Sequence, residues 1–410
     1  MAKYLMAQEN SRIIPKEDKI FGINKLAKEM IAKEGKENVV NATVGALLDD
    51  NGDLVVLSSV VDVLKNLEPQ DYAEYAPIGG TPEYRKHIIE ATFGKFKPKS
   101  HTRALATPGG TGAIRNTIEN YTQRGEKVLT SDWFWAPYNT IAQELERKLV
   151  TYTLFDENDN YNLSSFEEKV KEILEIQDNL VVIINTPAHN PTGYTLTLKD
   201  WNGVIDILKK YSKGKKITIL ADVAYIDFAG DEDKYREFFP VLDDLPENIL
   251  AVVAFSMSKG FTLYGLRGGA MICITKNEDI AEEFVLVNSF SARASWSNCP
   301  RAAMKVLSSI YEDEALLAKV KAERKKFCDM LVKRGKAFEQ AAAEAGLKTV
   351  PFDSGFFISI PCKDPDAVGK ELQKSGIFAV PLAKGLRISV ASISEELCKT
   401  IPAKVKAAMS

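Results

Sequence analysis

The chain of 410 residues is 45% hydrophobic and 27% charged, an ordinary composition for a globular protein with a large buried core. Its 53 basic and 56 acidic side chains leave a net charge of −3, so the chain offers no overall field for nucleic acid or an anionic membrane surface. Five scattered cysteines without a CxxC pair argue against a disulfide framework and a thiolate metal site, and three histidines without an HExxH motif argue against a histidine metal centre.

The N-terminal segment shows neither a secretory signal nor a strand pattern. It lacks the apolar stretch of a signal peptide, and no run in the chain approaches the roughly 18 apolar residues of a membrane helix. We therefore expect a cytoplasmic protein that binds neither membrane nor nucleic acid. We expect the residues before about Asp53 to pack with the C-terminal part of the chain.

Short apolar runs in the middle of the chain lack polar alternation, as buried parallel strands do. They lie at residues 127–131, 180–185, 217–222, 250–256 and 270–275. Helical patterns at residues 165–177 and 198–210 separate some of these runs, which predicts an α/β fold with a three-layer αβα domain and a mostly parallel sheet. Because only residues 257–269 separate the last two runs, which is marginal for a helical crossover, we predict that this pair is antiparallel.

After about residue 312 the pattern changes to that of a smaller α+β domain. A long charged helix is predicted over residues 314–345, with an interruption at Gly335. Short strands are predicted at residues 355–360, 376–381 and 385–390, and helices at residues 364–374 and 393–409. We therefore expect a large domain of residues 53–312 and a small domain built from residues 1–52 and 313–410, within the two or three domains that the length allows.

Polar motifs follow the predicted strands, where ligands bind in open α/β sheets. They are TPAHNPTG at residues 186–193, ADVAY at 221–225, SMSKG at 256–260 and GLRGG at 265–269. A glycine-rich turn at residues 109–113 leads into a helix, and the free N–H groups of such a turn are suited to a phosphate. Each motif alone is also compatible with an ordinary structural role, such as a helix N-cap for Asp222 or a surface position for Lys259.

Together with GLRIS at residues 385–389, this ordered set resembles the class I aminotransferases, which are pyridoxal-phosphate enzymes of fold type I. The glycine turn around Gly45, the loop that begins at Tyr75 and the segment RASWSNCP at residues 293–300 resemble the aspartate aminotransferase branch. The resemblance covers about residues 41–392. It implies fold type I, pyridoxal 5'-phosphate as the cofactor, and a homodimer with shared active sites.

The resemblance implies a role for each matching residue. Lys259 would form the Schiff base and move the proton, Asp222 would pair with the ring nitrogen, and Asn190 and Tyr225 would bind the phenolic oxygen. The phosphate donors would be Gly110, Thr111, Ser256, Ser258, Arg267 and, from the partner subunit, Tyr75. Trp135 would stack on the ring, with Trp133 as the competing candidate, and His189 either supports Asp222 or is an ordinary loop histidine.

Two arginines bear on the substrate. Arg387 would bind the substrate α-carboxylate beside Gly45 and Asn190, and Arg293 would reach the distal carboxylate across a dimer interface. We therefore expect an enzyme of amino acid metabolism that moves the amino group of aspartate to 2-oxoglutarate by a ping-pong cycle. The alternatives are an aromatic amino acid aminotransferase and a C–S β-lyase or decarboxylase. A ligand-sensing regulator is disfavoured because no helix-turn-helix extension is visible, and an inactive scaffold because Lys259, Asp222 and Arg387 are all present.

Overall fold

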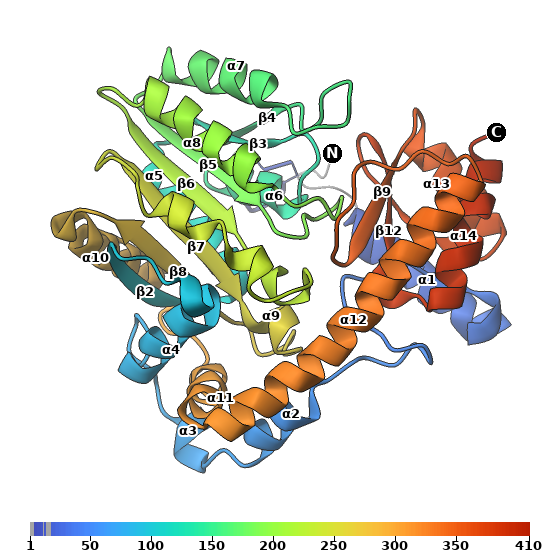
Figure 1. The fold of residues 1–410 in the computed structure, drawn as a ribbon, viewed down its shortest axis with the longest axis horizontal. Coiled ribbons are helices and arrows are strands. Elements are labelled where there is room, and N and C mark those ends of the chain that lie inside the picture. Colours follow the sequence, from blue (N-terminus) through green and yellow to red (C-terminus); the bar gives the residue numbers. More distant parts are fainter. Residues whose placement is uncertain (1–3, 11, 14–17) are drawn as a thin grey trace.

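The computed structural model describes residues 4–10, 12–13 and 18–410. Its largest element is a seven-stranded sheet in the order β2-β8-β7-β6-β5-β3-β4 (Figure 1). The strands are β2 (His101–Pro108), β3 (Lys127–Ser131), β4 (Lys148–Tyr152), β5 (Asn179–Asn185), β6 (Lys216–Asp222), β7 (Ile249–Ser256) and β8 (Gly268–Thr275). Strand β8 runs antiparallel to β2 and β7, whereas the other neighbouring pairs are parallel, so the predicted mostly parallel sheet with one antiparallel strand is confirmed.

Helices cover both faces of this sheet because buried strand residues alternate between two apolar clusters. Val181 and Ile183 of β5 pack in the cluster under α5, α6 and α10. Their neighbours Val182 and Ile184 pack in the cluster under α4, α7, α8 and α11. The bounds of these helices are α4 (Pro82–Phe93), α5 (Gly109–Tyr121), α6 (Pro137–Glu144), α7 (Leu163–Leu174), α8 (Leu198–Tyr211), α10 (Glu278–Ser295) and α11 (Arg301–Glu312).

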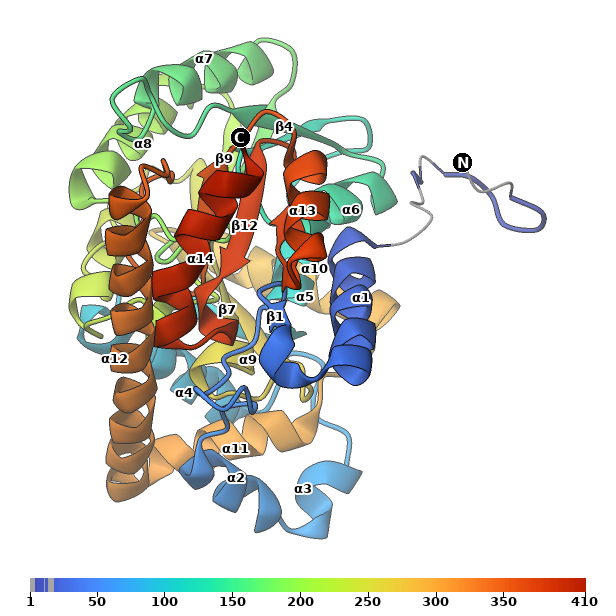
Figure 2. The same ribbon diagram turned by 90° about the vertical axis from the view of Figure 1, so that its right-hand side faces the viewer.

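A smaller unit is built mainly from the C-terminal part of the chain (Figure 1). It contains a three-stranded antiparallel sheet in the order β11-β12-β9 and a parallel pair, β1-β10. These strands are β1 (Val40–Asn41), β9 (Phe357–Pro361), β10 (Ile377–Phe378), β11 (Val380–Pro381) and β12 (Gly385–Ser389). Figure 2 shows α1 (Lys19–Glu34) and β1 beside α13 (Pro365–Lys374) and α14 (Glu395–Ala408). Strand β1, for which the sequence shows no strand pattern, pairs with β10 and so joins the N-terminal segment to the C-terminal part of the chain.

Helix α12 (Glu314–Glu344) runs from α11 beside the large sheet to α14 in the smaller unit (Figure 1). The predicted interruption at Gly335 is wrong, because the helix continues through this residue. A Cβ at Gly335 would lie 2.6 Å from the ring of Phe352, so the glycine permits a close packing contact. The remaining elements are α2 (Ser58–Lys65), α3 (Pro69–Ala73), α9 (Met257–Gly260), and the 3₁₀ turns at Lys36–Asn38, Gly94–Phe96, Ile226–Phe228, Lys234–Arg236, Phe239–Leu242 and Val390–Ser392.

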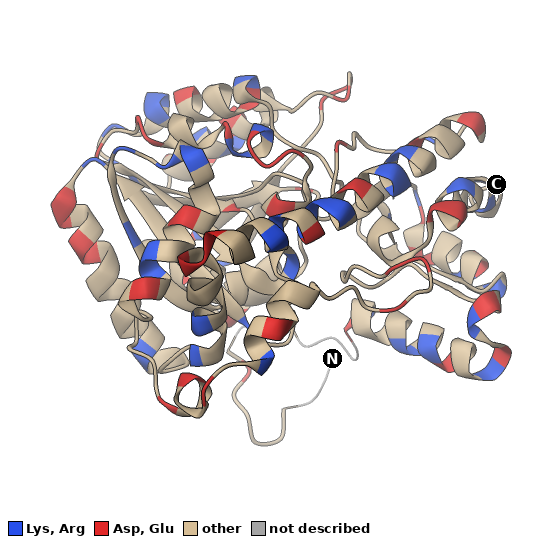
Figure 3. Cartoon of the chain, turned by 60° about the horizontal axis from the view of Figure 1, so that its bottom comes forward, with Lys and Arg blue, Asp and Glu red and all other residues tan. Residues whose placement is uncertain are grey.

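Basic and acidic side chains are interspersed over the surface helices, and α12 carries both along its length (Figure 3). Among the helices of the described residues, none has both the length and the apolar character needed to cross a membrane. All five cysteines are free thiols.

Candidate active site

A cavity of about 170 Å³ lies at the carboxyl ends of β5, β6 and β7, between these strands and the start of α5. The structure brings ten of the predicted cofactor residues to its wall. They are Gly110, Thr111, Trp135, Asn190, Asp222, Tyr225, Ser256, Ser258, Lys259 and Arg267.

One end of the cavity carries donors suited to an anion. Gly110 and Thr111 lie in the first turn of α5, where backbone N–H groups lack helical partners. Nη1 of Arg267 donates to Oγ of Ser258 at 3.3 Å, and the carbonyl of Arg267 accepts from the N–H of Gly109 at 2.8 Å. These contacts hold the guanidinium beside the start of α5, and together the groups can bind a phosphate.

The other end of the cavity carries a buried carboxylate. Asp222 ends β6 and is 5% exposed, and its Oδ1 accepts from the N–H of Ala224 at 3.2 Å. The hydroxyl of Tyr138 donates to Oδ2 at 2.5 Å. Burial raises the pKa of Asp222, while these two hydrogen bonds and the charge of Lys259 oppose that rise. A carboxylate in this position can pair with a protonated ring nitrogen.

Lys259 lies between these ends, in α9 directly after β7. Its Nζ donates to the carbonyl of Gly45 at 3.1 Å and lies 4.7 Å from the ring centroid of Tyr264. Burial, and then the charges of Arg267 and Arg387, lower the pKa of Lys259 to about 8. The amine therefore loses its proton at a much lower pH than a free lysine does, as a nucleophilic lysine requires.

Asn190 and Tyr225 face each other across the cavity wall, and Nδ2 of Asn190 donates to the hydroxyl of Tyr225 at 3.2 Å. Asn185 fixes the segment that carries Asn190, because its Oδ1 accepts from the N–H of Asn190 at 2.7 Å. Its Nδ2 in turn donates to the carbonyl of Asp222 at 2.8 Å. The two polar groups and the carboxylate are thus held in one rigid arrangement.

A second cavity of about 540 Å³ shares Trp135, Asn190, Tyr225 and Lys259 with the first, and its wall includes Gly45 and Arg387. Arg387 lies in β12 and is 4% exposed. Its Nη2 donates to the carbonyl of Thr43 at 2.8 Å and its Nη1 to Oδ1 of Asn190 at 3.4 Å, while its buried Nε has no protein partner. Burial lowers the pKa of Arg387 to about 10, so the guanidinium remains charged at neutral pH and can bind a carboxylate.

Tyr75 and Arg293 line neither of these two cavities. Tyr75 is 89% exposed, and Arg293, near the end of α10, is also exposed. The two segments are tied together, because Nδ2 of Asn298 donates to the carbonyl of Ala76 at 2.7 Å. Both residues that the resemblance assigns to a partner's site therefore belong to linked surface segments.

The structure separates the remaining candidates. Trp135 lines both cavities, whereas Trp133 is buried in the main core. Nδ1 of His189 contacts the hydroxyl of Thr192 at 2.8 Å, and burial lowers the pKa of His189 to about 3. The side chain that donates a hydrogen bond to Asp222 is that of Tyr138, which sequence analysis did not identify as a site residue. The one feature of the sequence that could have pointed to Tyr138 is its position one turn after Trp135, at the start of a helix that begins with a proline.

The chemistry of these groups fits pyridoxal phosphate, the cofactor that the resemblance implies. The anion donors, the lysine and the carboxylate line one cavity, and they match the phosphate, the aldehyde and the ring nitrogen of this molecule.

A Cβ at Gly269 would lie 2.5 Å from the backbone of Gly109, so only glycine permits β8 to approach the start of α5 this closely.

Comparison with known proteins adds independent observations. A family model for aminotransferase class I and II matches residues 37–404. The chain is 26% identical to an aspartate aminotransferase of Salmonella typhi over 389 residues, 92% of this chain and 95% of that protein. It is 27% identical to an aromatic-amino-acid aminotransferase of Escherichia coli (strain K12) over 305 residues, 72% of this chain and 74% of that protein. An aminotransferase structure from Anaerococcus prevotii matches with a TM-score of 0.97 at 38% identity and covers 99% of this chain and 100% of that one.

Proposed function

This chain belongs to the class I and II aminotransferases, which depend on pyridoxal phosphate, and we propose that it transfers the amino group of aspartate to 2-oxoglutarate in a ping-pong cycle. The observation that carries the proposal of amino-group transfer, for any amino acid donor, is the buried, charged Arg387 in a cavity that also contains Lys259. An amino acid held by its α-carboxylate at Arg387 would present its Cα toward the lysine. Two observations support aspartate as the donor: the segment at residues 293–300 resembles that of the aspartate aminotransferase branch, and some relatives are named for aspartate.

The cofactor, when bound, supplies an electron sink for the charge that develops at the substrate Cα. Lys259 would hold the cofactor and move the proton to and from Cα, which its lowered pKa favours. Asp222 would keep the ring nitrogen protonated, and Asn190 and Tyr225 would bind the phenolic oxygen. The first turn of α5, Ser256, Ser258 and Arg267 would bind the phosphate, and Trp135 would pack on the ring.

We propose a homodimer in which Tyr75 and Arg293 complete the partner's site. Their exposure and their linked segments support this arrangement. Leu286, Phe290 and Arg293 are spaced so that they share one face of α10, and both apolar members are exposed. Arg293 would then bind the distal carboxylate of a dicarboxylic donor from across the interface.

An aromatic amino acid is the second candidate donor. The 540 Å³ cavity has the apolar side chains Ile20, Phe21 and Phe357 in its wall, and relatives named for aromatic amino acids match at similar identity. An aromatic ring could occupy this space without a distal carboxylate. Such an enzyme would use Arg387 in the same way.

A half-reaction with a panel of amino acids tests the donor directly. The yellow holoenzyme is mixed with aspartate, glutamate, tyrosine, phenylalanine and alanine, and the loss of its visible absorption is followed without an acceptor. Aspartate should bleach the enzyme fastest, and Arg293→Ala should slow the dicarboxylic donors but not phenylalanine. Fastest bleaching by tyrosine or phenylalanine would establish the aromatic alternative, and pyruvate release from a cysteine conjugate would indicate a lyase.

The division into a large domain of residues 53–312 and a small domain of residues 1–52 and 313–410 remains a proposal. It is supported by the two separate groups of strands and by the separate apolar clusters beneath them. We also propose a cytoplasmic location, which the free thiols support.

A further inference from the structure

Tyr138 is fully buried and contacts two residues of the cofactor cavity wall. It is the second residue of α6, and its hydroxyl donates to Oδ2 of Asp222 at 2.5 Å. Its N–H donates to the carbonyl of Trp135 at 2.9 Å, and its ring packs edge-on against the Trp135 ring with centroids 5.5 Å apart. One side chain therefore contacts both the carboxylate and the aromatic ring that we assign to the cofactor.

We propose that Tyr138 is a positioning residue that orients Asp222 and keeps it charged, so that the ring nitrogen of the cofactor stays protonated. The inference rests on the proposed pairing of Asp222 with that nitrogen. Tyr138 lines neither of the two cavities, so it would act on the cofactor through its contacts with Asp222 and Trp135.

The chemistry of a neutral donor suits this position. A lysine or arginine beside Asp222 would also favour the carboxylate, but its positive charge would oppose protonation of the adjacent ring nitrogen. A tyrosine hydroxyl stabilises the carboxylate without adding charge. Burial first, and then the charge of Asp222, raise the pKa of Tyr138 well above its usual value, so the hydroxyl remains a donor over the whole working range of pH.

Other groups that face Asp222 cannot replace this contact. The N–H of Ala224 is bonded to the other carboxylate oxygen, Oδ1. Lys259 of α9 acts on Asp222 through its charge, and Tyr225, which follows β6, uses its hydroxyl as the acceptor for Asn190. His189 faces Thr192. Oδ2 of Asp222 therefore depends on Tyr138 for its protein hydrogen bond.

The test compares Tyr138→Phe with Tyr161→Phe. Tyr161 is a buried tyrosine outside both cavities whose hydroxyl shares one hydrogen bond with that of Tyr152 at 2.8 Å, so its variant also loses one buried bond. Each protein is loaded with pyridoxal phosphate labelled with ¹⁵N at the ring, and the nitrogen chemical shift is measured by NMR, because protonated and neutral pyridine nitrogens differ strongly in shift. Cofactor dissociation constants are measured in parallel.

In Tyr138→Phe, the nitrogen shift should move toward that of neutral pyridine. The cofactor dissociation constant and the half-reaction rate should each worsen by about 10- to 100-fold, the range expected for a lost hydrogen bond to a charged group. Tyr161→Phe should keep the wild-type shift. A wild-type shift in Tyr138→Phe would overturn the inference, even if activity fell. Asp222→Asn separates the two claims: if it also keeps the wild-type shift, the pairing of Asp222 with the nitrogen is wrong.

Discussion

Burial of the charged Lys259 amine destabilises the folded protein, and the same burial lowers the pKa of this amine as its chemistry requires. Its pKa falls from 10.5 to about 8 in the folded protein without cofactor. Below pH 8 the amine is charged in both the folded and the unfolded chain, so the folded state carries the full cost of a buried charge. Between pH 8 and 10.5 the unfolded chain binds more protons, so the free energy of unfolding rises with pH.

Replacement of this lysine by an apolar side chain should therefore stabilise the apoprotein at neutral pH. We expect Lys259→Met to raise the free energy of unfolding by on the order of 1–3 kcal/mol at pH 7, while abolishing transamination. The gap between variant and wild type should close as the pH approaches 10.5. Urea unfolding of both apoproteins at several pH values measures this gap, and a difference that did not change with pH would contradict the assigned cause.

Arg387 should be needed for every amino acid donor, because all donors share the α-carboxylate. We expect Arg387→Ala to lower kcat/KM by about 100-fold or more for dicarboxylic and aromatic donors alike, and Arg387→Lys to recover only part of the loss. Steady-state kinetics with aspartate and phenylalanine measure the effect. Arg103→Ala, which removes a surface arginine paired with Glu278 and Glu282, is the control and should leave both donors unaffected.

The residues that line the cofactor cavity could be predicted from sequence because they follow strands whose carboxyl ends meet at one edge of the sheet. Tyr138 could not, since it reaches Asp222 from a helix that begins in a different connection. Tyr75 and Arg293 could be recognised by motif alone, and a single chain leaves both of them outside the two cavities.

At the scale of elements, apolar runs predicted the central strands and missed those at the edges. Strands β3 and β5 to β8 were found because they are nearly continuous apolar segments. Strands β2 and β4 are the edge strands of the sheet, and β4 has only one buried residue. Strand β1 is only two residues long and is defined by its pairing with β10, which is far away in the sequence. A local sequence pattern cannot predict such a pairing.

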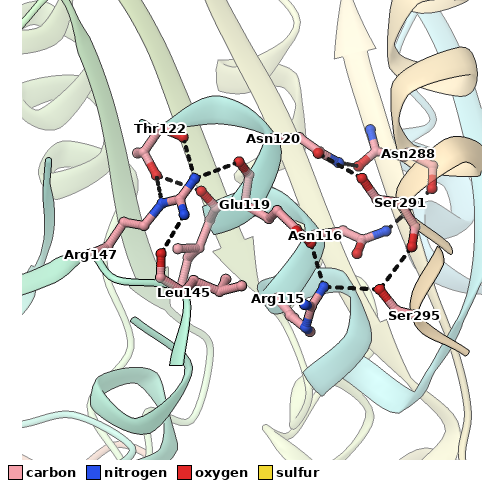
Figure 4. Close-up of polar contacts among 11 residues, drawn as sticks. Arg115, Asn116, Glu119, Asn120, Thr122, Leu145, Arg147, Asn288, Ser291 and Ser295 are labelled. Atoms are coloured by element: carbon pink, nitrogen blue, oxygen red, sulfur yellow. Dashed lines mark hydrogen bonds and ion pairs between the residues drawn. The ribbon is translucent and has the colours of Figure 1, made fainter. Parts of the chain in front are cut away.

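Helix α5, whose first turn faces the cofactor cavity, is held firmly at its other end (Figure 4). Nη2 of Arg147 donates to the carbonyls of Glu119 and Thr122 at 3.0 and 2.7 Å, Nε donates to the Thr122 hydroxyl at 3.1 Å, and Nη1 contacts the carbonyl of Leu145. Beside it, Nδ2 of Asn120 donates to Oδ1 of Asn288 in α10. A cation at a helix C-terminus also complements the helix dipole.

Removal of this cap should destabilise the fold. We expect Arg147→Ala to lower the free energy of unfolding by about 2–4 kcal/mol, because it leaves several backbone carbonyls unpaired. Arg124→Ala is the control, since Arg124 is mostly exposed and pairs with Glu146 at 3.8 Å, and it should change stability by less than about 0.5 kcal/mol. Equal losses in urea titrations of the two variants would refute a capping role.

At the scale of the whole molecule, the proposed dimer depends on apolar residues that the single chain leaves exposed. Phe290 of α10 is 79% exposed, and a carboxylate at this position would have to be buried in an interface. We expect Phe290→Asp to weaken dimerisation by about 100-fold and to reduce activity at low protein concentration. Analytical ultracentrifugation measures the change, with Ile176→Asp as the control at a site 67% exposed on another part of the surface. An unchanged dimer would place the interface elsewhere.

The pairing of Val40 with Ile377 joins segments near the two ends of the chain. Thr43 and Gly45, which follow β1, supply the carbonyls that hold Arg387 and Lys259. During synthesis, the ribosome releases the first of these partners long before the last is made, and such distant contacts form late in folding. The substrate pocket can therefore be completed only after residues 377–389 have left the ribosome, so a nascent or truncated chain that lacks them could assemble the large sheet without becoming a competent enzyme.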